Sequence, residues 1–436
     1  MTFPSEIATV LPPEERAPGL VDRLNRQFAY VRERSKFYRA KLGIVLGPFD
    51  GLDDFAKKVP VTTKQELRAD QSAFPPFGSN LCISENEIAR IQGTSGTTGR
   101  STLLCFSRDD WENASAATAR ICANAGLTSS DRLAITMPLH LFVGGWGLVG
   151  AAETLGATVL TVGGLHPEKQ LEIMLETDAT ALVSTPSYAL HLVRLAEGLG
   201  LDLAASPLRL AFLGGEPGLG VPEFRNRIET GLGVRAIDFG NTAEVHPCSN
   251  MGCGQSDGMH IYDDIIYTEI VDPDDPTRLV PEGEEGILVY TPLDRQAMPL
   301  LRFWSGDLGI ATSAPCACGR PYRRIVGGLR GRLDDLIIHR GVKFLPVDVE
   351  RLISETLGTP SPFAMVQQGA ESSYTLFVEW QQDVPEVAAQ LAEALRRDLT
   401  CTIPVRLVDP GRLPKAGLKA KRVWRAEDGF ALGETH

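Results

Sequence analysis

The feature that most constrains the fold of this chain is a regular alternation of helix-like and strand-like segments between residues 103 and 215. Helical spacing of apolar residues predicts helices at 109–125, 145–155, 167–176 and 187–199. Short runs rich in apolar and β-branched residues predict intervening strands at 132–136, 158–162, 181–185 and 208–215. This rhythm indicates βαβ units, and we therefore expect a parallel or mixed sheet with helices packed on it.

Strand patterns become denser from about residue 259 to 312, which predicts a β-rich subdomain that closes a large domain. The pattern then changes to an α+β unit, with helices predicted at 347–357 and 385–398 and strands at 363–367, 373–379 and 404–408. Near the N-terminus, residues 20–45 have helical spacing with charges on one face. We therefore expect an α/β protein with a large multi-layer N-terminal domain, residues 1–333, and a small mobile α+β C-terminal domain, residues 334–436.

The composition limits the class of partner. Hydrophobic residues make up 43% of the chain and charged residues 22%, as in a soluble globular protein. The formal charge is −12 and no Lys/Arg block stands out, so we expect neither nucleic acid nor an anionic membrane as a partner. No apolar run approaches the roughly 20 residues of a membrane span, and the first residues lack a basic segment before an apolar one. We expect a cytoplasmic protein.

A glycine- and hydroxyl-rich segment, GTSGTTGR at residues 93–100, has the composition of a phosphate-binding loop. Glycines let backbone N–H groups turn toward an anion, hydroxyls add donors, and the terminal Arg100 supplies charge. The segment is not a Walker A loop, because five residues rather than four separate Gly93 from Gly99, and Arg100 stands where lysine is required. Taken alone, the segment fits a flexible surface turn equally well.

The cysteines are too sparse for a disulfide scaffold, at eight in the whole chain. Four of them nevertheless fall in two short segments, HPCSNMGCGQSDGMH and APCACGRP. Three of these cysteines and a histidine make a plausible Cys₃His zinc set: Cys253, His260, Cys316 and Cys318. His246 and Cys248 are spare candidates, and a group of reduced thiols without metal is the alternative.

An ordered set of motifs identifies the family that the chain resembles. SKFYRAKL, VPVTTKQELRAD, GTSGTTGR, LAFLGGEPG, DFGNTAEVHP, SGDLG, CACGRPYRRI, GRLDDLIIHRGVKFLPVDVE and LPKAGLKAKRV follow one another across nearly the whole sequence. In this order they resemble the adenylate-forming superfamily, and more narrowly its phenylacetate–CoA ligase branch. Some members of that branch carry a structural zinc, and Cys253 and His260 fall at matching places.

The resemblance implies a two-step reaction. A carboxylic acid attacks the α-phosphate of ATP with the help of Mg²⁺, giving an acyl-adenylate and pyrophosphate. The thiol of coenzyme A then displaces AMP and forms a thioester. The alternatives are transfer to a carrier-protein phosphopantetheine or another nucleophile, and a zinc-stabilised binding protein of the same fold with reduced catalysis. A homodimer is compatible with the sequence.

The resemblance also implies an ATP site. The phosphate loop would use Thr94, Ser95, Gly96, Thr97, Thr98, Gly99 and Arg100, the last in place of the usual lysine. The nucleoside would be held by Gly215, Glu216, Pro217, Asp238, Phe239 and Gly240 around the adenine, and by Asp307 and Arg332 at the ribose. Asp334 sits at the family's hinge position.

Catalytic roles are implied for three residues. Lys419 matches the lysine that bridges the acid and the α-phosphate, although Leu418 stands where a glycine is usual and Lys415 is an alternative. Thr242 fills the Ser/Thr place beside the α-phosphate. The family's Mg²⁺ ligand follows directly, but Ala243 occupies that place here, so Glu244 is the expected ligand from a shifted loop.

Aromatic residues and glycines in MPLHLFVGGWG and TPSYAL predict a flat pocket for a planar acid. The expected lining residues are His140, Phe142, Gly145, Trp146, Tyr188 and Gly214. Stripes of this kind also occur as plain core, and His140 fits either a contact with a polar ring substituent or a satisfied core histidine.

Overall fold

The computed structural model describes residues 13–94, 101–368, 373–381, 384–414 and 420–433. The described part begins with four helices, and β1 and β2 then form an antiparallel hairpin. Their bounds are α1 Pro13–Arg34, α2 Lys36–Leu42, α3 Leu52–Lys58, α4 Lys64–Ala73, β1 Ile88–Gly93 and β2 Leu103–Ser107. The helical spacing at 20–45 corresponds to two helices: Ser35 follows the first and N-caps the second, its side chain accepting a hydrogen bond from the Tyr38 amide.

The predicted alternation of helices and strands is present. The helices are α5 Arg108–Asn124, α6 Val143–Leu155, α7 Pro167–Glu176 and α8 Pro186–Gly198. The strands are β3 Arg132–Ile135, β4 Thr158–Thr161, β5 Ala181–Ser184 and β6 Leu210–Gly214. A further helix and strand, α9 Pro222–Leu232 and β7 Arg235–Thr242, continue the series. Strands β3 to β7 pair in parallel, as βαβ units require.

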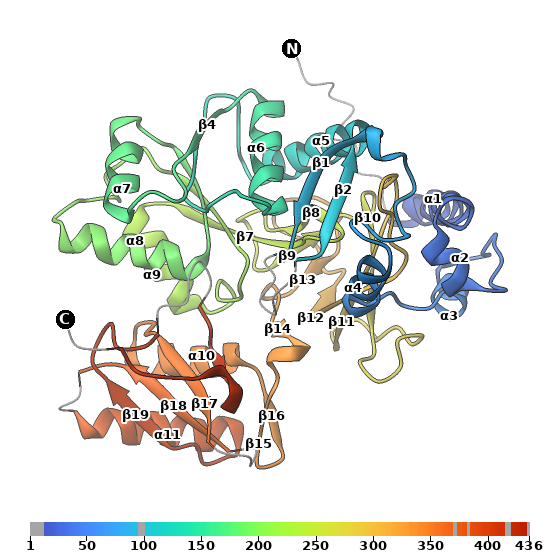
Figure 1. Ribbon diagram of the computed structural model, residues 1–436. Coiled ribbons are helices and arrows are strands. Elements are labelled where there is room, and N and C mark those ends of the chain that lie inside the picture. Colours follow the sequence, from blue (N-terminus) through green and yellow to red (C-terminus); the bar gives the residue numbers. More distant parts are fainter. Residues whose placement is uncertain (1–12, 95–100, 369–372, 382–383, 415–419, 434–436) are drawn as a thin grey trace.

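The β-rich segment extends this sheet with antiparallel strands. The full order is β10-β11-β12-β13-β9-β8-β7-β6-β5-β3-β4, with β14 paired to β12. The added strands are β8 His246–Met251, β9 Met259–Ile261, β10 Ile266–Val271, β11 Glu285–Pro292, β12 Phe303–Thr312, β13 Arg324–Ile325 and β14 Gly331–Arg332. One mixed sheet therefore runs through the large part of the molecule, as Figure 1 shows.

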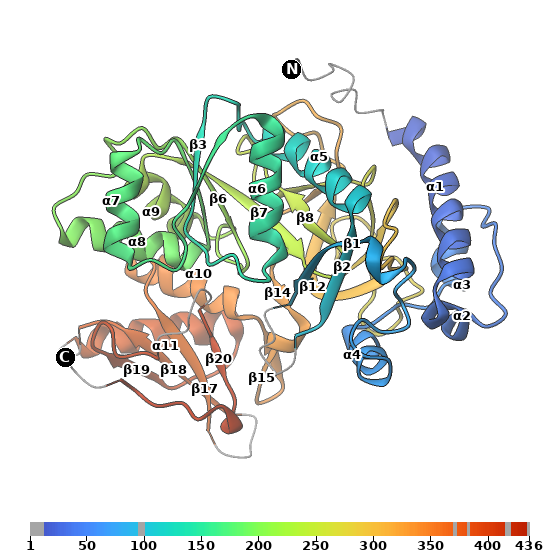
Figure 2. The ribbon, with the colours of Figure 1, turned by 45° about the horizontal axis from the view of Figure 1, so that its top comes forward.

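Helices cover both faces of the parallel half of this sheet. Leu133 and Ile135 point into a core shared with α5 and α6. Ala134, between them, points into a second core shared with α7, α8 and α9. Successive side chains of a strand face opposite sides, so the two buried layers follow directly from the sequence. Figure 2 shows α6 beside α5 and, in another part of this layered unit, α7 beside α8.

The C-terminal unit has its own sheet and core. Its elements are β15 Ile337–His339, β16 Val342–Phe344, α10 Pro346–Leu357, β17 Phe363–Gln367, β18 Tyr374–Glu379, α11 Pro385–Leu399, β19 Val405–Val408 and β20 Val423–Trp424. The sheet order is β19-β18-β17-β20, and α10 and α11 contribute buried leucines to one core with it. This unit, orange to red in Figure 1, lies below α8 and α9. The mixed α/β class with a smaller C-terminal domain is confirmed; the boundary at residue 334 and the mobility stay predictions.

Among the helices of the described part, none combines the length and apolarity that crossing a bilayer would require.

Candidate active site

The base of the predicted phosphate loop is closed by two threonines. The Thr94 amide donates to the Thr102 carbonyl at 3.2 Å, and the Thr102 amide donates to Thr94 Oγ1 at 3.2 Å. The Gly93 amide bonds the Leu141 carbonyl at 2.9 Å, which ties the loop to the start of α6. The loop residues 95–100, and with them the predicted donors Ser95, Gly96, Thr97, Thr98, Gly99 and Arg100, lie outside the described residues.

Thr242 and Glu244 lie at the turn between β7 and β8. Thr242 ends β7 and its side chain bonds the hydroxyl of the fully buried Tyr290. That hydroxyl also accepts from Asn250 Nδ2 at 2.9 Å. The turn places Glu244 two residues beyond the end of β7. The Glu244 side chain is 5% exposed there. Burial of a carboxylate requires a compensating charge, and a lysine supplies it here.

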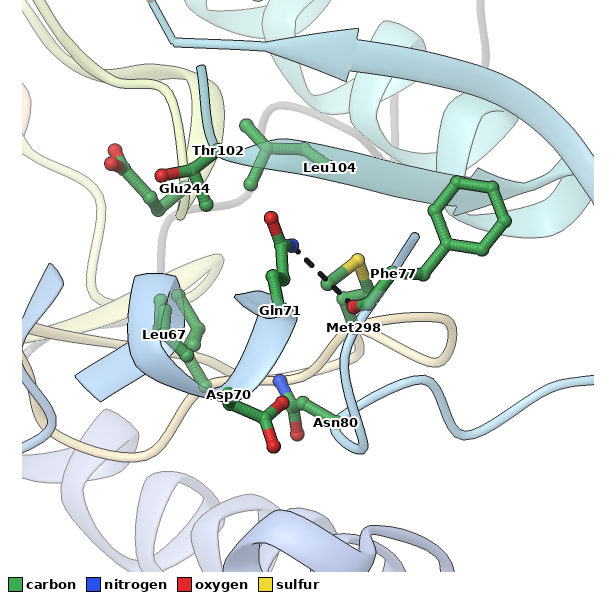
Figure 3. A pocket seen from close by; sticks show the side chains of 10 residues that line it. Leu67, Asp70, Gln71, Phe77, Asn80, Thr102, Leu104, Glu244 and Met298 are labelled. Atoms are coloured by element: carbon green, nitrogen blue, oxygen red, sulfur yellow. Dashed lines mark hydrogen bonds between the residues drawn. The ribbon is translucent and has the colours of Figure 1, made fainter. Parts of the chain in front are cut away.

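That lysine is Lys64, the first residue of α4, whose Nζ lies 2.9 Å from Glu244 Oε1. Glu244 and Thr102 lie together at one side of a narrow pocket that Gln71 and Leu104 also line, as Figure 3 shows. The pocket therefore lies directly beneath the strand that follows the phosphate loop. Lys64 was not singled out from the sequence, because nothing in the spacing connects residue 64 to residue 244.

Asp307 and Arg332 face each other across β12 and β14, where they are register partners. Arg332 Nη1 lies 3.8 Å from Asp307 Oδ1, and the Asp307 side chain is 13% exposed. Burial opposes the charge on Arg332, yet the carboxylates of Asp307 and Asp334, with Asp335 and Glu244, raise its pKa. The exposed Asp334 lies 3.5 Å from the Arg332 guanidinium. The structure thus brings the predicted ribose and hinge residues together near Glu244.

The predicted adenine residues come from β7 and from the loop after β6. Gly214 approaches β7 so closely that an ideal Cβ would lie 2.3 Å from the Phe239 carbonyl oxygen, which excludes any side chain there. Gly215 has φ 92°, a conformation that favours glycine. Gly240 follows Phe239 on β7, and Pro217 is exposed. Burial raises the pKa of the Asp238 carboxyl to about 7; Arg225 opposes this shift and Asp257 reinforces it.

Glu216 has an unexpected pair of contacts. Its Oε1 accepts from the Ser187 amide at 2.7 Å, and its Oε2 accepts from the Ala420 amide at 2.8 Å. Ala420 follows Lys419 directly, while residues 415–419, including Lys415, Leu418 and Lys419, lie outside the described residues. The carboxylate therefore links the nucleotide-side loop to the C-terminal unit.

The predicted acid-pocket residues fall into two groups. His140, Phe142, Gly145 and Trp146 surround the start of α6, whereas Tyr188 and Gly214 lie at the start of α8 and the end of β6. Trp146 Nε1 donates to the His140 carbonyl at 2.9 Å, and the His140 side chain is exposed. A single flat slot for a ring remains a prediction.

A guanidinium, Arg90, lies beside this first group, over Trp111 at 4.3 Å and over Trp146 at 5.0 Å. The sequence suggested no role for Arg90, because the two tryptophans that it contacts lie far from it along the chain.

The four predicted zinc ligands do come together. The ligand atoms of Cys253, His260, Cys316 and Cys318 all lie within 4.8 Å of one another. Cys253 Sγ is 3.5 Å from Cys316 Sγ, and Cys318 Sγ is 3.4 Å from His260 Nε2. The spare candidates His246 and Cys248 are outside this set; the His246 ring Nδ1 bonds the Cys248 backbone, and the Cys248 thiol donates to the Asn250 carbonyl.

The protonation states in the cluster differ, because burial raises the pKa of Cys253 to about 11. Burial would raise the pKa of Cys316, but hydrogen bonds with Ser256 and the Cys318 amide lower it to about 7. Burial, helped by two arginines, lowers the pKa of His260 to about 4, so its imidazole is neutral at pH 7. A thiolate and a neutral imidazole are the forms that bind metal.

Comparison with known proteins identifies the family. The model of the AMP-binding enzyme family matches residues 51–290, and that of the AMP-binding enzyme C-terminal domain matches residues 341–426. The chain belongs to the AMP-binding enzyme family. A phenylacetate–coenzyme A ligase of Thermus thermophilus is 34% identical over 97% of this chain and 99% of its own length. ATP and coenzyme A are consistent with such a ligase family.

Solved structures of this family agree over almost the full length. A 2-hydroxyisobutyryl-CoA ligase in the postadenylation state, in complex with 2-HIB-AMP, has a TM-score of 0.90 at 32% identity, covering 96% of this chain and 91% of that chain. The same ligase in the thioesterification state, in complex with 2-HIB-AMP and CoA, has a TM-score of 0.73, covering 95% and 91%. The two units of this AMP-binding enzyme are therefore arranged more like the first state than the second.

Proposed function

We propose that the chain is an AMP-forming ligase that activates an aromatic carboxylic acid with ATP and transfers the acyl group to coenzyme A. The observation that carries this proposal is the full-length similarity to a phenylacetate–coenzyme A ligase. The gathering of Thr242, Glu244, Asp307 and Arg332 near the base of the phosphate loop is consistent with it. These residue types suit a nucleoside triphosphate, because a carboxylate can accept from the ribose hydroxyls while a hydroxyl and cations can bind the phosphates.

In the first step, a carboxylate oxygen of the acid attacks the α-phosphorus, and the bond to the pyrophosphate oxygen breaks. Thr242 ends β7, at the position expected beside the α-phosphate, and its side chain bonds the Tyr290 hydroxyl. Asp307 would accept from the ribose hydroxyls while Arg332 limits its movement. Lys419 would neutralise charge that develops between the acid and the α-phosphate.

In the second step, the sulfur of the acceptor thiol attacks the acyl carbonyl, and the bond to the AMP oxygen breaks. The thiol proton leaves with solvent or a base, and AMP departs as a phosphate anion. The residues that hold the ribose are the same in both steps, so Asp307 retains AMP until the thioester has formed. No feature of the described residues favours a carrier protein over coenzyme A.

Lys64 stands beside Glu244, the proposed Mg²⁺ ligand. Its Nζ lies 2.9 Å from Glu244 Oε1 in this arrangement. A carboxylate has a second oxygen, so Glu244 would still supply one oxygen ligand, and phosphate oxygens and water would supply the others. When bound, Mg²⁺ would neutralise phosphate charge, and we derive no step through it.

The thiol and histidine cluster fits Zn²⁺. Zinc–ligand bonds of about 2.3 Å to sulfur and 2.0 Å to nitrogen give ligand separations of roughly 3.5–3.8 Å in a tetrahedron. The 3.4 and 3.5 Å separations here are close to these values. Cys253 precedes β9, His260 lies within it, and the two remaining cysteines precede β13, so a zinc would fasten the β9–β13 pair and take no part in acyl transfer.

A substrate panel tests the proposal. Pyrophosphate release would be measured with ATP and each of phenylacetate, benzoate, amino- and hydroxybenzoates, and 2-hydroxyisobutyrate as the aliphatic control. We expect release with at least one aromatic acid, followed by thioester formation with coenzyme A. Transfer only to a phosphopantetheinylated carrier protein would show that the acceptor is a carrier protein and not coenzyme A. ATP binding without turnover of any acid would refute the ligase and favour a binding protein.

A further inference from the structure

The Arg90 side chain stacks on two tryptophans. Its guanidinium carbon lies 4.3 Å from the centroid of the Trp111 ring and 5.0 Å from that of the Trp146 ring. Among the described residues, this guanidinium has no hydrogen bond or ion pair, so cation–π attraction is the interaction that holds it. Arg90 belongs to β1, Trp111 to α5 and Trp146 to α6, and the stack therefore joins three elements.

The register of the β1–β2 hairpin directs Arg90 toward these helices. Arg90 is the register partner of Phe106, which is fully buried and meets the edge of the Trp111 ring at 5.3 Å between centroids. Register partners lie on the same face of a hairpin. The neighbouring Ile91, on the other face, is 43% exposed. The strand therefore turns the Arg90 side chain to the aromatic layer under α5 and α6.

Trp146 connects this stack to a strained turn. Its Nε1 donates to the His140 carbonyl at 2.9 Å. His140 has φ 32°, a backbone conformation that residues other than glycine rarely adopt and that surrounding contacts have to maintain. The Phe142 amide closes the same turn by donating to the Leu139 carbonyl at 2.7 Å. Movement of the Trp146 indole would remove one of these two bonds and release the turn.

The turn and the start of α6 lie against the candidate active site. The Leu141 carbonyl accepts from the Gly93 amide, just before the phosphate loop, at 2.9 Å. On its other side, α6 approaches the start of β8 so closely that a Cβ on Gly147 would lie 2.1 Å from Pro247 Cβ. The His140 turn is therefore fixed between the phosphate loop and the turn that joins β7 to β8, where the proposed reaction brings the acid to ATP.

We propose that Arg90 is a positioning residue for the carboxylic acid: by stacking on Trp146 it holds the His140 turn, and with it one wall of the acid site. The inference rests on the proposed ligase function and deepens it, because it gives the acid site a determinant outside its predicted lining. An acid that binds only to the ordered wall loses apparent affinity in proportion to the fraction of molecules in which that order is lost.

Arg90→Met tests the proposal, because methionine keeps an unbranched apolar side chain but removes the cation. One such stack shifts an equilibrium about two- to fivefold, so the loss of both should raise the KM for the acid about 5- to 30-fold in pyrophosphate release. The KM for ATP should stay within about twofold of wild type. Arg90→Lys keeps a cation without the planar guanidinium and should recover part of the loss. Arg406→Met removes a stack on Phe377 in the C-terminal unit and is the matched control, with neither constant changed.

A measurement without substrates separates this inference from the ligase proposal. The indole N–H signal of Trp146 is assigned in isotope-labelled protein by its loss in Trp146→Phe, and its exchange with solvent is compared in wild type and Arg90→Met. We expect exchange at least about fivefold faster in the variant, with the signals of Trp304 and Trp424, which pack in other cores, unchanged. If the wild type activates no acid, the ligase proposal fails, but faster exchange still supports the stack.

Three results would overturn the inference. Equal exchange of the Trp146 N–H in wild type and Arg90→Met would show that Arg90 does not hold the indole, whatever the activity. Faster exchange with an acid KM within about twofold of wild type would show that the turn does not govern acid binding. Equal increases in the KM values for the acid and for ATP would assign Arg90 to the general stability of the hairpin.

Discussion

The buried ion pair between Arg302 and Glu269 gives a test of how burial sets the energetic cost of breaking an ion pair in the large unit. Their side chains are 1% and 0% exposed, and Arg302 Nε donates to both carboxylate oxygens at 3.0 and 3.1 Å. The guanidinium also donates to the carbonyls of Ala56, Val59 and Pro276. Glu269→Gln keeps the volume of the side chain but removes its charge.

The expected cost follows from burial. Removing one partner of a buried pair leaves an uncompensated charge and costs about 3–5 kcal/mol. Glutamine retains one acceptor oxygen and creates no cavity, so we expect the lower end, about 3 kcal/mol. The three backbone acceptors keep Arg302 in place, and the charge cannot escape to water. An exposed pair of the same chemistry costs about 0–1 kcal/mol.

Urea unfolding, followed by circular dichroism, measures the difference. The control is Glu197→Gln, which breaks the exposed pair with Arg227 between α8 and α9, whose side chains are 51% and 34% exposed. We expect the Glu269 variant to lose about 3 kcal/mol of unfolding free energy in the transition of the large unit and the control to lose less than about 1 kcal/mol. Losses within about 1 kcal/mol of each other would refute the reasoning from burial.

Three further predictions concern the site. The pKa of Asp238 is raised to about 7 from an ordinary 3.8, so the folded state binds the carboxyl proton more tightly than the unfolded state does. The wild type should therefore lose stability relative to Asp238→Asn as the pH rises from 4 to 7. Parallel pH profiles of the two proteins in thermal melts would contradict this prediction. Cys318→Ser should reduce bound zinc from about one ion per chain to near zero on elemental analysis; metal-free, fully stable wild-type protein would remove the zinc proposal. Lys419→Ala should abolish pyrophosphate release but leave thioester formation from supplied acyl-adenylate largely intact, and equal loss of both would deny a role in the first step alone.

The order of elements could be predicted because it depends on local pattern. The helices and strands between 109 and 215 begin within about two residues of their expected positions, since apolar periodicity and turn residues set them. The break between α1 and α2 cannot be predicted from apolar spacing, which continues from one helix into the next, because a single side-chain cap at Ser35 decides it. The short strand β20 was missed because its two residues pair only through a partner far away in sequence.

The site could be predicted where a motif carries the position and not where distant segments meet. Asp307 and Arg332 were placed together by family motifs, and the structure pairs them. The Lys64–Glu244 pair joins residues that are 180 positions apart in the sequence, and no local pattern predicts it. Glu216 was predicted in the right loop, but its bond to Ala420 depends on how two units dock, which is a tertiary property.

Alternate residues of the parallel strands lie in different cores, so neighbouring substitutions on one strand disturb different layers. On β3, substitutions at Leu133 and Ile135 disturb the layer under α5 and α6, while one at Ala134 disturbs the layer under α7, α8 and α9. The second layer also packs against Val347 of α10 in the C-terminal unit. Substitutions at adjacent positions of β3 therefore disturb different layers, and the layer under α7, α8 and α9 is the one continuous with the C-terminal unit.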